Sequence, residues 1–214
     1  MRTMISMLVL GMALLISSAA RATTYNEAVN GDLSGDRANP TPIALTAGSN
    51  QVTATSMAGD IEYFTMTVPV GFRLSAITAV SNTSPSLSFI AVQKGSVFTE
   101  PPTGTNVAQL LGYGHFGPAN GTIGTDILDN LGIGAGAIGF VPPLAAGAYT
   151  FWSQETSASP STYTLDFVVT AAPAAAPLPR SSIAMIALGL VAVGGFVVSV
   201  RARRSSRTGS TPAV

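Results

Sequence analysis

Short stretches of alternating apolar and polar residues run through the middle of this chain. Within residues 61–68, Phe64, Met66 and Val68 fall on one face of an extended segment, and two threonines fall on the other. Residues 163–169 show the same period of two, which is typical of a half-buried strand. Four further stretches, rich in threonine, valine and aromatic residues, are expected to form strands: 51–56, 73–80, 86–92 and 148–154.

Glycine and proline separate these stretches. Gly59 precedes one expected strand, and Pro160 stands between the last two. Many short strands divided by such turns predict an all-β fold, specifically an antiparallel β-sandwich. The segment 95–143 is less regular, and one short helical turn is expected there at 125–131.

The N-terminus has the features of a secretory signal peptide. Arg2 precedes an apolar run at 5–16, and Ala20-Arg21-Ala22 fits the small-x-small pattern of a cleavage site. Cleavage at this position removes the signal helix, residues 1–22, and leaves Thr23 as the first mature residue. The alternative is an uncleaved anchor, but the apolar run is shorter than the ~20 residues that span a bilayer.

A second apolar run, at 183–200, contains no charged side chain and predicts a transmembrane helix. The alternative is a buried helix of a soluble core, which the glycines within the run would weaken. Four arginines follow directly and are expected to hold the basic tail, 201–214, on the cytoplasmic side: Arg201, Arg203, Arg204 and Arg207. The preceding segment, 171–182, is rich in proline and alanine and is expected to be an extended linker.

The remaining segment, 23–170, is the expected extracytoplasmic domain. It holds all ten carboxylates of the chain and three basic residues, Arg37, Arg73 and Lys94, so its net charge is −7 (10 negative, 3 positive). Nucleic acid is therefore not an expected partner, because phosphate binding needs a basic surface. The chain has no cysteine, which excludes disulfides, zinc–thiolate sites and a thiol nucleophile.

The C-terminal tail resembles the PEP-CTERM sorting signal of Gram-negative bacteria. The resemblance rests on the helix, the arginines and a short motif, here Pro177-Leu178-Pro179, in which leucine stands where the family has glutamate. It implies recognition by an exosortase, removal of the helix, and release or attachment of the mature protein outside the cell. It also implies an association with exopolysaccharide. Simple anchoring by an uncleaved helix is the alternative.

Two segments of the central domain resemble the bacterial pre-peptidase C-terminal (PPC) domain. Residues 59–71 match that family's acidic-x-acidic-aromatic strand, which ends in Val-Pro-x-Gly, and residues 144–152 match its Leu-x-x-Gly-x-Tyr-x-Phe hairpin. The resemblance implies a jelly-roll-like β-sandwich that serves as an accessory module.

Carboxylates are frequent in the N-terminal part of this domain, and calcium prefers several carboxylate and carbonyl oxygens. Some PPC domains bind calcium through acidic residues before the first strand and at the acidic-x-acidic step. The resemblance therefore implies calcium ligands at four positions: Glu27, Asp32, Asp60 and Glu62. The alternative is turn chemistry, since Asp and Asn stabilise turns through local hydrogen bonds.

Catalysis is not expected. His115 is the only histidine, and no G-x-S-x-G nucleophile motif accompanies it. Aromatic residues of the loop 112–118 and Trp152 are candidates for stacking on a sugar ring, although core packing is the simpler expectation for Trp152 in its strand.

These observations predict a non-enzymatic exported protein of the cell surface or extracellular matrix. It is expected either to stay anchored in the inner membrane, facing the periplasm, or to be released after C-terminal processing. Expected partners are signal peptidase, an exosortase-type enzyme, the membrane and exopolysaccharide; no cofactor is expected apart from calcium. The alternative function is a calcium- or carbohydrate-binding accessory module.

Overall fold

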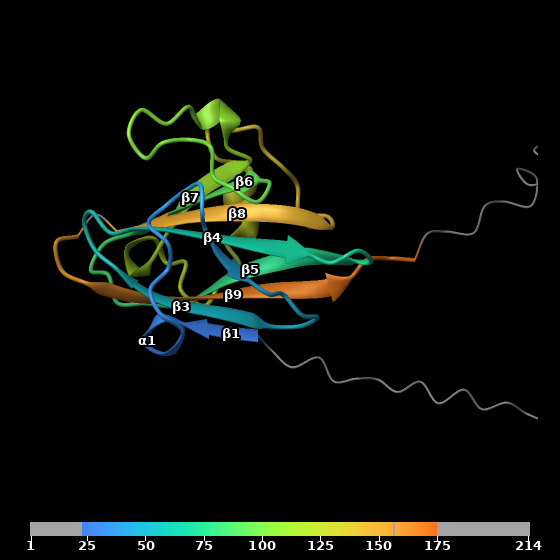
Figure 1. The fold of residues 1–214 in the computed structure, drawn as a ribbon, viewed down its shortest axis with the longest axis horizontal. Helices are drawn as coiled ribbons and strands as arrows, with labels where there is room; N and C mark the ends of the chain where they lie inside the picture. Colours follow the sequence, from blue (N-terminus) through green and yellow to red (C-terminus); the bar gives the residue numbers. More distant parts are fainter. Residues whose placement is uncertain (1–22, 156, 175–214) are drawn as a thin grey trace, which may run out of the picture. The chain divides into compact units, whose positions relative to one another are not determined.

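Two β-sheets are the main secondary structure of the described chain, which comprises residues 23–155 and 157–174 of a computed structural model (Figure 1). The expectation of a mostly-β domain is confirmed. The expected signal peptide, the sorting motif at 177–179, the membrane helix at 183–200 and the arginines after it lie outside the described residues. Among the residues that are described, no helix is long and apolar enough to cross a membrane.

The first sheet has the strand order β1-β3-β9-β5. Its strands are β1 (Thr23–Asn26), β3 (Asn50–Ser56), β9 (Ser161–Ala171) and β5 (Phe72–Asn82). The second sheet has the order β2-β4-β8-β6-β7. Its strands are β2 (Thr41–Ile43), β4 (Ile61–Val68), β8 (Gly147–Gln154), β6 (Ser88–Lys94) and β7 (Gly112–Phe116). The helical segments are α1 (Glu27–Asn30), η1 (Val107–Gln109), η2 (Pro118–Asn120) and α2 (Leu128–Gly132).

Both sheets are mixed, so the expectation of purely antiparallel sheets is wrong. β1 runs parallel to β3, and β2 runs parallel to β4, whereas the other pairs are antiparallel. From β1 to β5 the chain alternates between the two sheets. Each crossing to the other sheet reverses the direction of the chain. After two crossings the chain is back in its first sheet and runs in its first direction, so β3 lies parallel to β1 and β4 lies parallel to β2.

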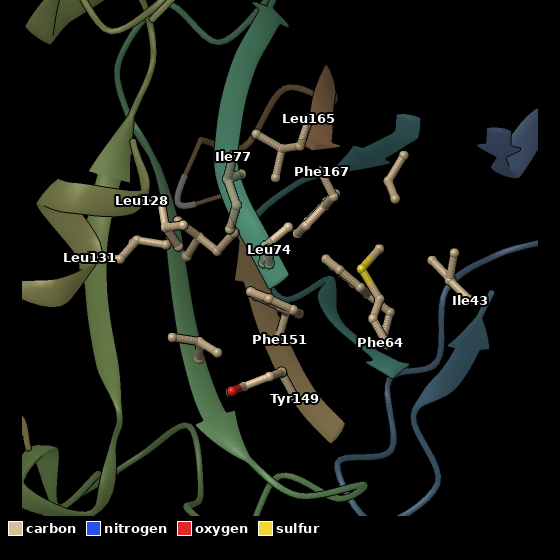
Figure 2. Close-up of a cluster of buried hydrophobic side chains, with 14 of the residues drawn as sticks. Ile43, Phe64, Leu74, Ile77, Leu128, Leu131, Tyr149, Phe151, Leu165 and Phe167 are labelled. Carbon is tan, nitrogen blue, oxygen red and sulfur yellow. The ribbon is translucent and has the colours of Figure 1, made fainter. Parts of the chain in front are cut away.

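The inward faces of the two sheets pack around a common apolar core (Figure 2). Phe64 and Phe151 stack with ring centroids 5.3 Å apart, and Phe167 from the other sheet meets both rings edge-on. Leu128 and Leu131 of α2 point toward Ile77 and close one side of this core. The alternation seen in the sequence thus decides which side chains face inward.

The segment 95–143, expected to be irregular, contains the strand β7 and the helix α2. The helical turn falls close to its expected place, and Asp126 Oδ1 accepts hydrogen bonds from Leu128 N and Ile77 N, both at 2.9 Å. β7 is rich in glycine because it packs against α2: a Cβ on Gly112 would lie 2.2 Å from Leu131 O. Its glycines therefore serve close packing, although in the sequence they resemble a loop.

The outer face of the second sheet carries a smaller apolar cluster. Tyr63 of β4 and Trp152 of β8 are buried there against Phe98 and Leu110. The last two residues belong to the segment between β6 and β7, which lies over this side of the sheet in Figure 1. Both faces of β4 and β8 are thus covered over much of their length.

Candidate functional site: an acidic cluster at the end of the core

Three carboxylates converge where the N-terminal segment meets β4. One oxygen from each of Glu27, Asp32 and Glu62 lies within 4.8 Å of the other two. We call these three residues the acidic cluster. Asp32 is exposed, Glu27 is half-buried and Glu62 is fully buried, so the group extends from the surface into the end of the core.

A tight turn after β1 brings Glu27 and Asp32 to the same place. The Asn26 side chain caps α1 by accepting from Ala28 N at 3.0 Å, and Asn30 Oδ1 accepts from Asn26 N at 2.8 Å. Gly31 follows with φ +93°, a conformation that favours glycine. Tyr25 Oη donates to the carbonyl of Gly31 at 2.7 Å. The local sequence therefore fixes this turn before any ligand is considered.

Backbone donors hold the Glu27 carboxylate in place. Its Oε1 accepts from Leu33 N at 3.1 Å, and its Oε2 accepts from Thr55 N at 2.6 Å. Thr55 belongs to β3, the parallel neighbour of β1, so Glu27 joins the N-terminal segment to the first sheet. Each oxygen keeps a second lone pair, which a cation can use.

Glu62 occupies an inward position of β4, two residues before Phe64. Its exposed fraction is 0%. Oε2 accepts a hydrogen bond from Tyr163 Oη of β9, across the interior between the two sheets. For Oε1 no hydrogen-bond donor is present in the part of the chain that the structure describes. A buried carboxyl oxygen without a partner is costly unless a proton or a cation accompanies it.

The electrostatics of the acidic cluster favour a bound positive charge. Burial, reinforced by the negative charges of Glu27, Asp60 and Asp32, raises the pKa of Glu62 to about 9, although the hydrogen bond from Tyr163 acts in the opposite direction. Burial, with the charge of Asp32, also raises the pKa of Glu27, against the two backbone hydrogen bonds and a side-chain hydrogen bond with Glu62. The pKa of Tyr25 is raised by its own burial and by the neighbouring carboxylates. A proton on Glu62 or a metal cation would each relieve this repulsion.

The four expected calcium ligands do not all meet. Asp60 is not part of the acidic cluster, although its own burial and, to a smaller extent, the charge of Asp32 raise its pKa. Turn chemistry accounts for another nearby acid, Asp36, which accepts from Ala38 N at 2.9 Å and from Asn39 Nδ2 at 2.7 Å. Both hydrogen bonds lower the pKa of Asp36, and the one from the Asn39 side chain has the larger effect.

The aromatic candidates for sugar stacking divide between the interior and the surface. Phe116 is buried in the main core and Trp152 in the outer cluster, as expected for packing residues. His115 is exposed, and its ring meets Phe89 edge-on at 5.6 Å. Tyr113 donates from Oη to the carbonyl of Ala135 at 2.8 Å.

Sequence reasoning missed Tyr163 and Thr55 as parts of this site. Both act on the acidic cluster from strands distant in sequence, and no local pattern identifies such a contact. Glu62 carried a signal that was available: it continues the inward phase of Phe64, Met66 and Val68. A carboxylate at an apolar position of a strand predicts a buried acid.

Comparison with protein-family models, curated protein sequences and solved structures finds no match for this chain. The geometry of the domain and the sequence of its ends are therefore the basis for a functional assignment.

Proposed function

We propose that residues 23–170 form a non-catalytic, calcium-binding accessory module of an exported surface protein. The observation that carries the proposal is the acidic cluster, with Glu62 Oε1 buried and without a hydrogen-bond donor among the described residues. Negatively charged groups held this close need a counter-charge, and within the domain carboxylates outnumber basic residues by ten to three.

The donor set suits a hard divalent cation. Three carboxylates supply up to six oxygens, and calcium takes six to eight oxygens in flexible geometry, some from water. The exposed position of Asp32 leaves room for water ligands on the outer side. Tyr163 and the backbone of Leu33 and Thr55 would orient the ligands from behind, as outer partners do in many metal sites. Calcium bound here would neutralise the repulsion and attach the N-terminal segment to β4.

The cellular setting we propose comes from the sequence. The signal peptide supports export, and the run at 183–200 with its arginines supports membrane insertion. The proline-bounded motif at 177–179 supports sorting by an exosortase-type enzyme. The finer jelly-roll-like classification is likewise proposed from the resemblance of residues 59–71 and 144–152 to the PPC domain. In this setting the module would stand outside the cytoplasm, in contact with the cell surface or its exopolysaccharide.

Calcium-dependent thermal unfolding of the purified full-length protein tests the proposal. After EDTA treatment, calcium at about 100 times its dissociation constant should stabilise the native state by about 2.7 kcal/mol. For a domain of this size that corresponds to a rise in Tm of about 5–10 °C. Isothermal titration should show one site per chain, with magnesium binding more weakly.

Glu62→Gln should abolish the calcium-dependent rise in Tm, because it removes the most buried charge of the acidic cluster. Asp129→Asn is the matched control, since Asp129 is an exposed acid of α2 outside the cluster, and it should retain the full response. A wild-type protein whose Tm is unaffected by millimolar calcium would refute the proposal. An equal response in both variants would place the ion elsewhere.

A further inference from the structure

A second feature of the molecule lies on the opposite face of β4 from the acidic cluster. Consecutive residues of a strand point to opposite sides, so Ile61 faces outward where Glu62 faces inward. Ile61 helps to line a surface depression of about 310 Å³. Its walls come from the turn before β4, the end of β8 and the segment after β6: Ala58, Gly59, Ile61, Pro102, Thr103, Gln154 and Glu155.

The floor of this depression continues across the sheet as one row of side chains. Ile61 pairs with Gln154, Gln154 with Phe89, and Phe89 with His115 in the strand register. The neighbouring row, which contains Tyr63 and Trp152, is buried beneath the segment after β6. The row from Ile61 to His115 is the first one beyond that cover, and its members range from half-buried to exposed.

Two contacts with Trp152 fix the orientation of the side chains that this row exposes to a ligand. Trp152 Nε1 donates to Gln154 Oε1 at 3.1 Å, which sets the orientation of the amide and leaves Nε2 to donate to a ligand. Phe89 meets Trp152 edge-on with ring centroids 4.8 Å apart, so its half-exposed ring is supported from below. An apolar surface therefore adjoins a positioned amide, and the exposed Thr103 is a further polar residue of the lining.

Charge and volume narrow the ligand class. None of the lining residues is basic, and the carboxylate of Glu155 is buried, where it accepts from Ser88 Oγ and Ser157 N. An anionic ligand would therefore find no positive partner in the depression and would be repelled by the net negative charge of the domain. The volume is at the lower end of the range for small-ligand sites. A neutral sugar ring suits these features, because it offers an apolar C–H face and several hydroxyl groups.

We infer that this depression binds neutral sugar units of a glycan. The C–H face of a ring would rest on Ile61, Pro102 or Phe89, and its hydroxyls would accept from Gln154 Nε2 and exchange hydrogen bonds with Thr103. This inference goes beyond the calcium proposal and does not depend on it, since the two sites lie on opposite faces of β4.

The single tryptophan of the chain provides the assay. Trp152 contacts both Gln154 and Phe89, so a sugar bound there should change its fluorescence emission. The full-length protein is titrated with cellohexaose, laminarihexaose, maltohexaose and mannohexaose, and with an oligogalacturonate as the anionic probe. We expect a saturable change with at least one neutral oligosaccharide and none with the oligogalacturonate, with and without EDTA.

Gln154→Ala should weaken this binding by about tenfold or more in isothermal titration. Thr103→Phe, in an exposed loop position, should block the depression without disturbing the core. Gln51→Ala is the matched control, because Gln51 lies on β3 in the other sheet, and it should bind like wild type. Absence of saturable binding across the neutral panel overturns the inference, as does an equal loss in Gln154→Ala and Gln51→Ala.

Discussion

The interior between the two sheets has an apolar middle and a polar end, which lie only two residues apart along the same strands. In the middle, Phe64 of β4 pairs with Phe151 of β8. Two residues earlier on β4, Glu62 pairs with Ser153. The other strands change in the same way, and the polar end gathers further buried side chains: Ser56, Asn82, Ser88, Glu155 and Ser161.

The difference separates the part of the core that stabilises the fold from the part that can bind a ligand. The side chains labelled in Figure 2 are aliphatic or aromatic, and burial of such surface is the main favourable contribution to folding. The polar end instead holds buried oxygens without partners among the described residues, on Glu62, Ser56 and Ser161. Such groups reduce stability, which is consistent with a site whose partner is a ligand.

Truncation in the apolar middle should have the largest effect on stability. Phe151 is fully buried, and its ring centroid lies 5.3 Å from that of Phe64 and 5.1 Å from that of Phe167. Phe151→Ala should therefore lower the free energy of unfolding by about 3–5 kcal/mol, measured by urea denaturation. Val141→Ala, at a side chain 88% exposed, should change it by less than about 0.5 kcal/mol. Comparable effects of the two variants would contradict the assignment of the core.

At the polar end, removal of a charge should stabilise the calcium-free protein. The pKa of Glu62 is about 9 in the folded state and 4.5 for an ordinary glutamate, so between these values the native state binds a proton that the unfolded state lacks. Stability is then highest below about pH 4.5 and falls as the pH rises toward 9. The raised pKa of Glu27 acts in the same direction.

Glu62→Gln removes the contribution of Glu62 to this pH dependence, because an amide cannot ionise. At pH 8 in EDTA the variant should be more stable than wild type by about 2–4 kcal/mol, and near pH 4.5 the difference should largely disappear. Urea denaturation at both pH values measures the change. A variant less stable than wild type at pH 8 would mean that Glu62 is ionised and satisfied in the folded protein.

Six of the strands could be predicted from the sequence: β4 and β9 from their alternation of apolar and polar residues, and β3, β5, β6 and β8 from their content of threonine, valine and aromatic residues. The parallel strands β1 and β2 could not, since segments of four and three residues are too short to show a period. Their placement depends on the alternation of the chain between sheets. β7 could not be predicted because it is rich in glycine, which is typical of loops. Its glycines are needed because α2 packs too closely against them to leave room for a Cβ.

The acidic cluster was only partly predictable. Acidic composition and the PPC resemblance singled out Glu27, Asp32 and Glu62, but also Asp60, whose position next to Gly59 in a turn keeps it outside the group. Sequence spacing cannot give the distance between Asp32 and Glu62, because these residues are thirty positions apart and meet where Tyr63 N donates to Ser34 O at 2.8 Å. The surface depression had no local signal either, since its walls come from three separate segments.

Tyr163→Phe should destabilise the polar end by removing the hydroxyl that donates a hydrogen bond to Glu62. The change leaves the buried ring and its edge-on contact with Phe116 intact, but Glu62 Oε2 loses its donor. Loss of a hydrogen bond to a buried group should cost about 1–3 kcal/mol in urea denaturation at pH 7. It should also raise the pKa of Glu62 further and weaken calcium binding. Unchanged stability and calcium affinity would exclude Tyr163 as a supporting residue.

The smallest change in the free energy of unfolding is expected for substitutions at the serines of the polar end. Here the sign of the change is more informative than its size. Ser161 Oγ is buried without a hydrogen-bond partner in the described chain, whereas Ser88 Oγ donates to Glu155 Oε2 at 3.0 Å. Ser161→Ala should therefore raise the free energy of unfolding by about 1 kcal/mol, and Ser88→Ala should lower it by about 1–3 kcal/mol. Both serines are 1% exposed, so differential burial cannot explain opposite signs. If urea denaturation instead shows a loss for both variants, a buried water satisfies Ser161, and the polar end is a hydrated extension of the acidic cluster.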